Sequence, residues 1–346
     1  LNAKYEQSIG RALDGIRDAE KRRLLVTKYI DERDERIPKI KQEVKSTAIA
    51  YMRKFEKVKI KPMYRELLTN RILLSELAAE WSFEEIEQFL AAHQKESWVL
   101  EDLAALYYLH ARIKGIPDKW KMRVVFIDEV QDYSLFQLAA LKVGLETDMF
   151  TMVGDLAQGI HSYRSLTEWD SVLKLFPRAT YATLQKSYRT TIEIMEVANK
   201  ILSKMDEDLP LVEPVVRHGK EPTFIRCEAF NADTILKTYN AIKSNGHRSI
   251  ALIAKTTAEA KTIVARLVEA GIPVSLLDES ATLDQSKLLV VPSHLAKGLE
   301  FDAVIIAAFD TPFYDHPIDR KLLYVALTRA MHELYLIGPD EETFLL

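Results

Sequence analysis

The sequence predicts an α/β protein with an additional helical segment at its front. From Met122 onward, short apolar runs alternate with stretches of helical periodicity, which is the pattern of a parallel sheet covered by helices on both faces. Before Met122 the apolar positions follow helical spacing. We therefore expect a helical front followed by parallel sheet.

Composition indicates a globular chain. With 346 residues and 48% hydrophobic content, the chain can bury more than one core. No apolar run approaches the roughly 20 residues that cross a bilayer, so we expect no membrane segment. The single cysteine, Cys227, cannot form an internal disulfide, which is typical of a reducing compartment, and we expect a cytoplasmic protein.

Charge is spread unevenly along the chain. The net charge is −4, but residues 1–65 carry +8 and the remainder −12. This asymmetry favours contact between the first segment and a polyanion or an acidic protein surface. A solvated, lysine-rich helical face would explain it equally well.

The helical front has two apolar series. The first runs through Ala12, Ile16, Ala19, Val26 and Ile30, and the second through Ile37, Ile40, Val44, Ala48, Tyr51 and Phe55. A charged run over 31–36 and Pro38 separate them, so we expect an antiparallel helical arm over residues 1–62. Further helices are expected over 63–114, ending near Gly115.

The remaining elements follow from the alternation. Strands are predicted at 123–128, 149–154, 180–184, 223–228, 249–254, 287–292, 302–308 and 333–337, with a strand–helix–strand unit over 247–276. Helices are predicted at 135–143, 191–205, 257–270 and 320–331.

Two adjacent acids end the first apolar run. Asp128 and Glu129 follow Val-Val-Phe-Ile, which places them where a buried parallel strand delivers ligands in an open sheet. One carboxylate can hold a magnesium ion that bridges nucleotide phosphates, and the other can orient or deprotonate water. Asp128 is the predicted metal residue and Glu129 the predicted base.

The chain resembles a superfamily 1 helicase motor of the UvrD/Rep type. The resemblance rests on Asp-Glu-Val-Gln-Asp at 128–132, Ala-Lys-Gly-Leu-Glu-Phe-Asp at 296–302 and Val-Ala-Leu-Thr-Arg-Ala at 325–330. It implies a RecA-like P-loop NTPase fold with two parallel-sheet lobes, residues 63–180 belonging to the first lobe and 181–346 to the second. It also implies ATP and Mg²⁺ as cofactors and single-stranded or duplex DNA as partner.

The resemblance assigns roles residue by residue. It implies that Gln158 senses the γ-phosphate, that Tyr188 stacks on the adenine, and that Arg189 and Arg329 contact the γ-phosphate, Arg329 as an arginine finger supplied within the chain. Gly298 would permit close backbone approach and Glu300 would bind the ribose. Tyr163 would stack on a nucleic-acid base, Arg164 would contact its backbone, and His294 would link nucleotide state to the bound strand. Ordinary structural roles remain open for Tyr163 and His294.

Some departures resemble the HelD/helicase IV-like branch more closely. Pro292 replaces a threonine usual in UvrD and Rep, and 105 residues separate Arg189 from His294, too few for a large accessory domain. Members of that branch act on RNA polymerase. The alternatives are therefore a DNA helicase or translocase, an ATP-driven RNA polymerase remodelling factor that binds through the arm, and a non-enzymatic nucleic-acid or protein binding module.

A glycine-rich phosphate loop of the form Gly-x-x-x-x-Gly-Lys-[Ser/Thr] does not occur in the sequence. The nearest match, Gly10 to Gly15, continues with Ile16 and Arg17. Because the chain also opens on Leu1, we expect a fragment whose front carried that loop. We also expect this chain alone not to hydrolyse ATP.

Overall fold

The computed structural model describes residues 1–346 except 53–57, 94–96, 161–165, 206–208, 216 and 279–286. Internal contacts divide the chain into two compact units, Leu1–Glu96 and Ser97–Leu346. Among the described residues, no helix is long and apolar enough to cross a membrane. The expected division into an arm over residues 1–62 and two lobes over 63–180 and 181–346 stays a prediction.

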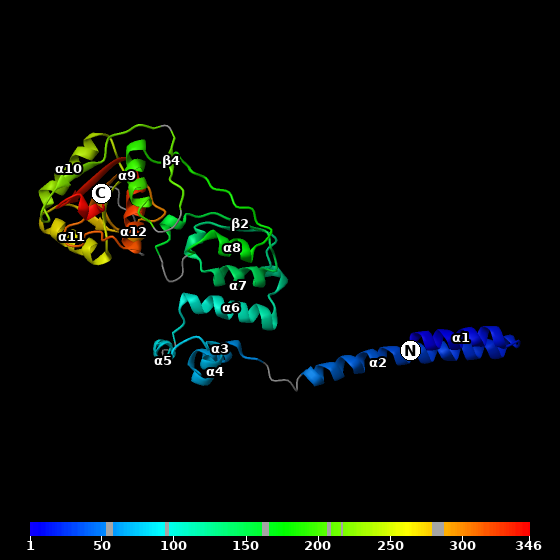
Figure 1. Ribbon diagram of the computed structural model, residues 1–346. Helices are drawn as coiled ribbons and strands as arrows, with labels where there is room; N and C mark the ends of the chain where they lie inside the picture. Colours follow the sequence, from blue (N-terminus) through cyan, green and yellow to red (C-terminus); the bar gives the residue numbers. More distant parts are fainter. Residues whose placement is uncertain (53–57, 94–96, 161–165, 206–208, 216, 279–286) are drawn as a thin grey trace. The chain divides into compact units, whose positions relative to one another are not determined.

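The first unit is helical. Its helices are α1 (Asn2–Gly15), α2 (Ala19–Met52), α3 (Ile60–Thr69), α4 (Arg71–Leu77) and α5 (Phe83–Ala92). Figure 1 shows α1 lying along α2. The expected break at 31–38 is wrong, because α2 continues through Pro38. The chain turns before α2 instead, where Asp18 Oδ1 accepts hydrogen bonds from the backbone N–H groups of Glu20 and Lys21 at 3.0 and 3.1 Å.

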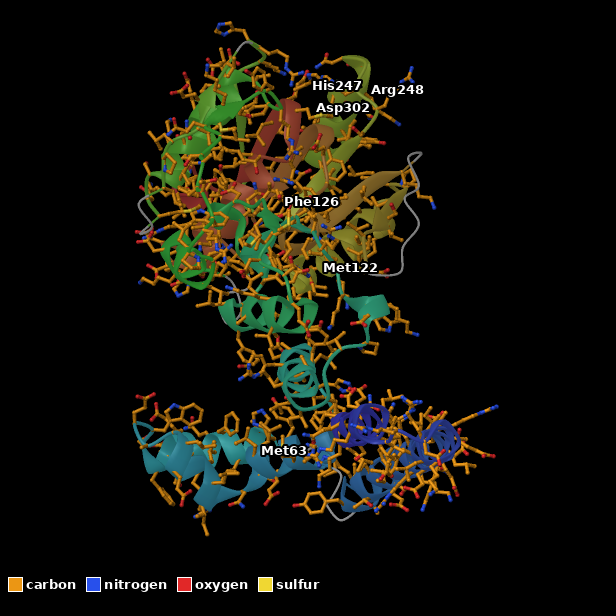
Figure 2. The ribbon with its side chains drawn as sticks, turned by 90° about the vertical axis from the view of Figure 1, so that its right-hand side faces the viewer. Met63, Met122, Phe126, His247, Arg248 and Asp302 are labelled. Atoms are coloured by element: carbon orange, nitrogen blue, oxygen red, sulfur yellow. The ribbon has the colours of Figure 1, made fainter. Side chains whose placement is uncertain are left out.

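The second unit begins with helix α6 and a short parallel sheet. The elements are α6 (Leu100–Lys114), β1 (Val125–Ile127), α7 (Leu135–Leu145), β2 (Phe150–Met152) and α8 (Trp169–Leu175). β1 pairs with β2 in parallel, and their inner face packs on α7 and α8 through Ile127, Leu138, Val172 and Phe176. Phe126 is 77% exposed and is labelled in Figure 2. Helices before Gly115 were predicted and are confirmed, whereas α8 was missed.

Residues 180–184 form no strand, so that prediction is wrong. Leu184 in this segment is 95% exposed. Residues of β2 and of the 178–185 segment line the same cavity of about 630 Å³. A strand needs a neighbour to receive its backbone hydrogen bonds, and this segment belongs to none of the sheets in the described part of the chain.

A six-stranded parallel sheet forms the centre of the second unit, in the order β5-β10-β9-β6-β8-β7. Its strands are β5 (Thr223–Arg226), β6 (Ile250–Ala254), β7 (Val274–Leu276), β8 (Leu288–Pro292), β9 (Phe301–Ala307) and β10 (Ala330–Gly338). Every residue of β6 and β8 is buried, as the continuous apolar runs predict for strands covered on both faces. The α/β class is therefore confirmed.

Helices cover both faces of this sheet. They are α9 (Ile192–Leu202), α10 (Ala232–Ser244), α11 (Thr257–Glu269) and α12 (Pro317–Leu327). α9 and α12 pack on one face and α10 and α11 on the other, an arrangement visible in Figure 1. Helix α10 was not predicted. The helix predicted at 320–331 ends at Leu327, because Ala330 already pairs with Phe301 in the sheet.

A side-chain clamp aligns two central strands at their beginnings. Asp302 Oδ2 accepts hydrogen bonds from the backbone N–H groups of Arg248 and Ser249 at 2.8 and 3.0 Å. Figure 2 shows Asp302, His247 and Arg248 gathered at one end of the sheet. The clamp supports the pairing of β6 with β9. A separate short pair, β3 (Lys186–Ser187) and β4 (Glu213–Pro214), precedes α9 and β5 in the chain.

Candidate active site

The carboxyl end of β1 presents the two predicted acids. Ile127 is buried in the core, and Asp128 and Glu129 follow it into the turn that leads to a 3₁₀ helix over Val130–Asp132. Asp128 Oδ1 accepts a hydrogen bond from the Glu129 N–H at 2.8 Å. Glu129 has the left-handed values φ 52° and ψ 40°, which are uncommon for a residue with a side chain and recur at functional sites.

Gln131 connects this turn to the end of β2. Its side chain is fully buried, Nε2 donates to Glu129 Oε2, and Oε1 accepts the N–H of Asp155 at 3.1 Å. Gly154 makes room for it, because a Cβ there would lie 2.3 Å from Gln131 Oε1. The ends of β1 and β2 are therefore locked together through one amide side chain. Gln131 was part of the quoted motif but received no role from the sequence.

Asp155 orients the predicted sensor Gln158. Asp155 Oδ2 accepts a hydrogen bond from Gln158 Nε2 at 2.7 Å, and its Oδ1 accepts one from the Ala157 N–H at 3.0 Å. Burial raises the pKa of the Asp155 carboxyl, although both hydrogen bonds oppose that shift. Because Nε2 is engaged in this way, Gln158 directs Oε1 toward another donor.

Arg329 supplies that donor. It lies in the turn between α12 and β10 rather than within the helix, which corrects the prediction. The side chain is 1% exposed, and Nη2 donates to Gln158 Oε1 at 3.0 Å. Nε donates to the Val325 carbonyl at 3.1 Å and Nη1 to the Leu299 carbonyl at 3.2 Å. Burial lowers the pKa of Arg329, and the nearby charge of Arg189 adds to this.

A second arginine lies beside these groups. Arg189 forms an ion pair with Glu300 at 2.7 Å, which brings two predicted nucleotide-binding residues into contact. The loop that carries Arg189 is held by Thr190, whose hydroxyl donates to the Ala330 carbonyl at 2.7 Å. Arg217, which was not predicted, also holds it through a bond from Nη2 to the Arg189 carbonyl at 2.7 Å.

The remaining predicted residues differ in how far the structure describes them. Tyr188 has an exposed side chain at 72%, and Gly298 adopts φ 76°, a value that favours glycine. His294 is exposed in the 3₁₀ turn Ser293–Leu295. Tyr163 and Arg164 lie outside the described residues, so their predicted roles stay predictions.

Lys297 was quoted in the sequence motif but was given no function. Its Nζ lies 2.7 Å from Asp132 Oδ1 and 3.2 Å from Glu129 Oε2, and its side chain is 10% exposed. The contact joins the loop before β9 to the end of β1. The only sequence signal for Lys297 was its place beside Gly298.

The two carboxylates at the end of β1 suit a magnesium ion that is shared with phosphate oxygens better than a metal ion bound by protein ligands alone. Asp128 and Glu129 offer carboxylate oxygens, the ligands that Mg²⁺ prefers. Within the described ranges, no group of three or more His, Cys, Asp or Glu side chains could hold a metal. Magnesium in nucleotide sites is commonly bound by one or two carboxylates together with phosphate oxygens, and such a donor set is what this turn offers.

Comparison with known proteins identifies helicase relatives. Residues 287–337 match the UvrD-like helicase C-terminal domain family. The chain is 27% identical over 246 residues to a "Probable DNA helicase" of Mycoplasma pneumoniae, covering 64% of this chain and 44% of that protein. It is 24% identical to the ATP-dependent DNA helicase PcrA of Leuconostoc citreum, covering 49% of this chain and 24% of the relative.

A further relative and a solved structure are similar. The ATP-dependent DNA helicase Rep of Buchnera aphidicola is 25% identical, with 59% of this chain and 32% of the relative covered. The solved C-terminal domain of a possible DNA helicase from Lactobacillus plantarum WCFS1 is 32% identical, covering 44% of this chain and 87% of that domain, with a TM-score of 0.36. The chain thus spans less than half the length of these curated relatives. The domain match and the helicase relatives relate the chain to UvrD/Rep-type superfamily 1 helicases.

Proposed function

We propose that this chain carries the hydrolytic and coupling residues of an ATP-dependent superfamily 1 DNA helicase or translocase, arranged on two RecA-like α/β parts. The observation that carries the proposal is the contact of Arg329 with Gln158, which joins the end of α12 to the end of β2. ATP would bind between these parts, and closure around it would be converted into movement along DNA.

The charge environment of Arg329 supports a phosphate partner. Its guanidinium is buried and donates hydrogen bonds to neutral oxygens of Gln158, Leu299, Val325 and Thr328. No carboxylate of a described residue lies within ion-pair distance of it. A buried cation is normally compensated by an anion, and the fork of a guanidinium suits phosphate oxygens.

The other predicted residues receive roles in this proposal. Asp128 would hold Mg²⁺, which supplies electrostatic stabilisation of phosphate charge when it is bound, and Glu129 would orient or deprotonate the attacking water. Arg189 and Glu300 would contact the nucleotide, and Tyr188 offers an exposed ring for the base. His294, Tyr163 and Arg164 would face the nucleic acid.

Hydrolysis measurements test the proposal. We expect the product of the complete reading frame to hydrolyse ATP, with stimulation by single-stranded DNA. Glu129→Gln and Arg329→Ala should each reduce kcat at least about a hundredfold. Lys261→Met, an exposed change on α11, is the matched control and should leave the rate unchanged. No hydrolysis with any DNA, or wild-type rates in both variants, would refute the proposal.

The isolated chain tests the requirement for a phosphate loop. We expect no steady turnover from residues 1–346 alone, because the β- and γ-phosphates lack the backbone amides and the lysine of such a loop. Turnover by this chain that is abolished by Glu129→Gln would contradict that expectation.

RNA polymerase remodelling, as in the HelD-like branch, is the second candidate. It is supported by the net charge of +8 over residues 1–65 and by the α1–α2 helix pair within that segment. We expect purified polymerase to retain the complete chain and not a variant without residues 1–60 if this candidate is right. Polymerase binding with turnover indifferent to DNA would favour remodelling over translocation. Binding without turnover would leave the binding-module alternative.

A further inference from the structure

We infer that Lys297 is a positioning residue that holds the Glu129 carboxylate and couples it to the loop before β9. The inference rests on the proposed function, in which Glu129 is the base. Lys297 contacts Glu129 and Asp132, and its proposed action passes through these two carboxylates.

Burial distinguishes this contact from an ordinary surface ion pair. Lysine side chains are almost never buried unless they are paired, and Lys297 is 10% exposed. Its Nζ meets two carboxylates at once, at 2.7 Å from Asp132 Oδ1 and 3.2 Å from Glu129 Oε2. Asp132 and Glu129 retain side-chain exposures of 29% and 45%. Solvent therefore reaches the side chains of the two acids more readily than the lysine side chain that pairs with them.

One hydrogen bond and one ion pair meet at the same oxygen of Glu129. Lys297 Nζ and Gln131 Nε2 both approach Oε2. Gln131 is itself held by the hydrogen bond that its Oε1 accepts from the Asp155 N–H, and it fits there because Gly154 has no side chain. Within the described part of the chain, Oε1 of Glu129 accepts no hydrogen bond from another residue. The two donors thus fix the carboxylate through Oε2 and leave Oε1 as the oxygen that can meet a water molecule.

The loop that carries Lys297 also contacts the two arginines of the site. Over residues 297–300, Lys297 pairs with Glu129 and Asp132, the Leu299 carbonyl accepts Arg329 Nη1 at 3.2 Å, and Glu300 pairs with Arg189 at 2.7 Å. Gly298, with φ 76°, gives the backbone the turn between Lys297 and Leu299. A displacement of this short loop would therefore move the base and the arginines together.

Hydrogen exchange on the chain of 346 residues tests the coupling. Lys297→Met keeps most of the length of the side chain and removes its charge. We expect exchange of the backbone amides over 128–133 to become roughly fivefold faster, because the turn loses its tie to the 297–300 loop. Lys297→Arg should restore most of the protection, and Lys261→Met should not change it. Wild-type exchange in Lys297→Met overturns the inference.

A double-mutant cycle separates coupling from a general loss of stability. Lys297→Met and Asp132→Asn should each make exchange over 128–133 faster, but not additively, so that the double variant exchanges no faster than Lys297→Met alone. Additive effects of the two changes would show that they act independently and would contradict the direct pairing. Circular dichroism of each variant confirms that it is folded before exchange is compared.

Kinetics on the product of the complete reading frame tests the positioning role. We expect Lys297→Met to lower kcat for ATP roughly tenfold to a hundredfold with KM changed less than about twofold, because the base is misplaced while the nucleotide contacts remain. Faster exchange with an unchanged kcat would overturn the positioning role and leave a structural ion pair. Absence of hydrolysis in the wild type would refute the proposed function, whereas the exchange result would still decide whether Lys297 holds the turn.

Discussion

Arg329 Nη2 donates a hydrogen bond to Gln158 Oε1 over 3.0 Å, although 171 positions separate the two residues in the chain. Each side chain is oriented by other bonds before it reaches its partner. Asp155 holds Nε2 of Gln158, and the carbonyls of Val325 and Leu299 hold the guanidinium. The contact is therefore part of a hydrogen-bond network in which Gln158 Nε2 and the other guanidinium nitrogens of Arg329 already donate to acceptors.

Replacing the guanidinium should disrupt that network. Arg329→Lys cannot supply donors in the fork geometry of arginine, so at least one buried oxygen loses its partner. We expect the free energy of unfolding to fall by about 1–3 kcal/mol. Urea denaturation followed by circular dichroism measures this. Arg266→Lys, at a side chain that is 43% exposed, should change it by less than about 0.5 kcal/mol. Equal losses in both variants would contradict the network.

Gly154 should not tolerate a methyl group. A Cβ would lie 2.3 Å from Gln131 Oε1 and 3.1 Å from the backbone nitrogen of Val130, which cannot move freely. We expect Gly154→Ala to lower the free energy of unfolding by about 1–3 kcal/mol through overpacking. The exposed change Glu228→Ala serves as the comparison. A crystal structure of Gly154→Ala with Gln131 still bonded to Glu129 and Asp155 would show this reasoning to be wrong.

Glu146 is a position where glycine should stabilise the protein. It follows α7 with φ 53° and ψ 40°, the left-handed conformation that glycine adopts most readily after a helix. Glu146→Gly loses a partly exposed ion pair with Lys121, at 2.8 Å, which contributes little. We expect a net gain of about 0.5–1 kcal/mol in the free energy of unfolding. Glu146→Ala retains the backbone strain and should give no gain, and a gain equal to that of glycine would count against the explanation.

Acid should weaken a side-chain contact at the start of α9. Glu193 accepts hydrogen bonds from the Gly219 N–H and from His218 Nδ1, both at 2.9 Å. Backbone hydrogen bonds and then the contact with His218 lower the pKa of Glu193 to about 2. Because the folded pKa lies below the ordinary value of 4.5, this stabilisation is present above about pH 4.5 and is lost as the pH falls toward 2.

Glu193→Gln tests that dependence. We expect a lower Tm than wild type at pH 6, with the difference shrinking as the pH falls from about 4.5 toward 2. Thermal unfolding by circular dichroism at several pH values measures it. A difference in Tm that stays constant over this range would mean that ionisation of Glu193 does not stabilise the fold.

Local pattern was sufficient for the class of the fold and for most of its strands. Continuous apolar runs such as Ile250–Ala254 predict buried parallel strands, because the faces of such strands are both covered. The same reasoning placed Asp128 and Glu129 at a strand end, since the boundary between an apolar run and two acids is visible in the sequence. These features depend on neighbours within a few residues, and they were predicted.

Features that depend on distant partners were decided only by the tertiary structure. Residues 180–184 have the pattern of a strand but pair with no strand in the described part of the chain. Helix α2 continues through Pro38, and the chain turns near Asp18 instead. Nothing in the sequence distinguishes the role of Lys297 from that of other lysines. In the fold its Nζ lies 2.7 Å from Oδ1 of Asp132, which is 165 positions away in the chain. Pairing, burial and long-range contacts arise when segments meet in space, and no local periodicity records which segments those are.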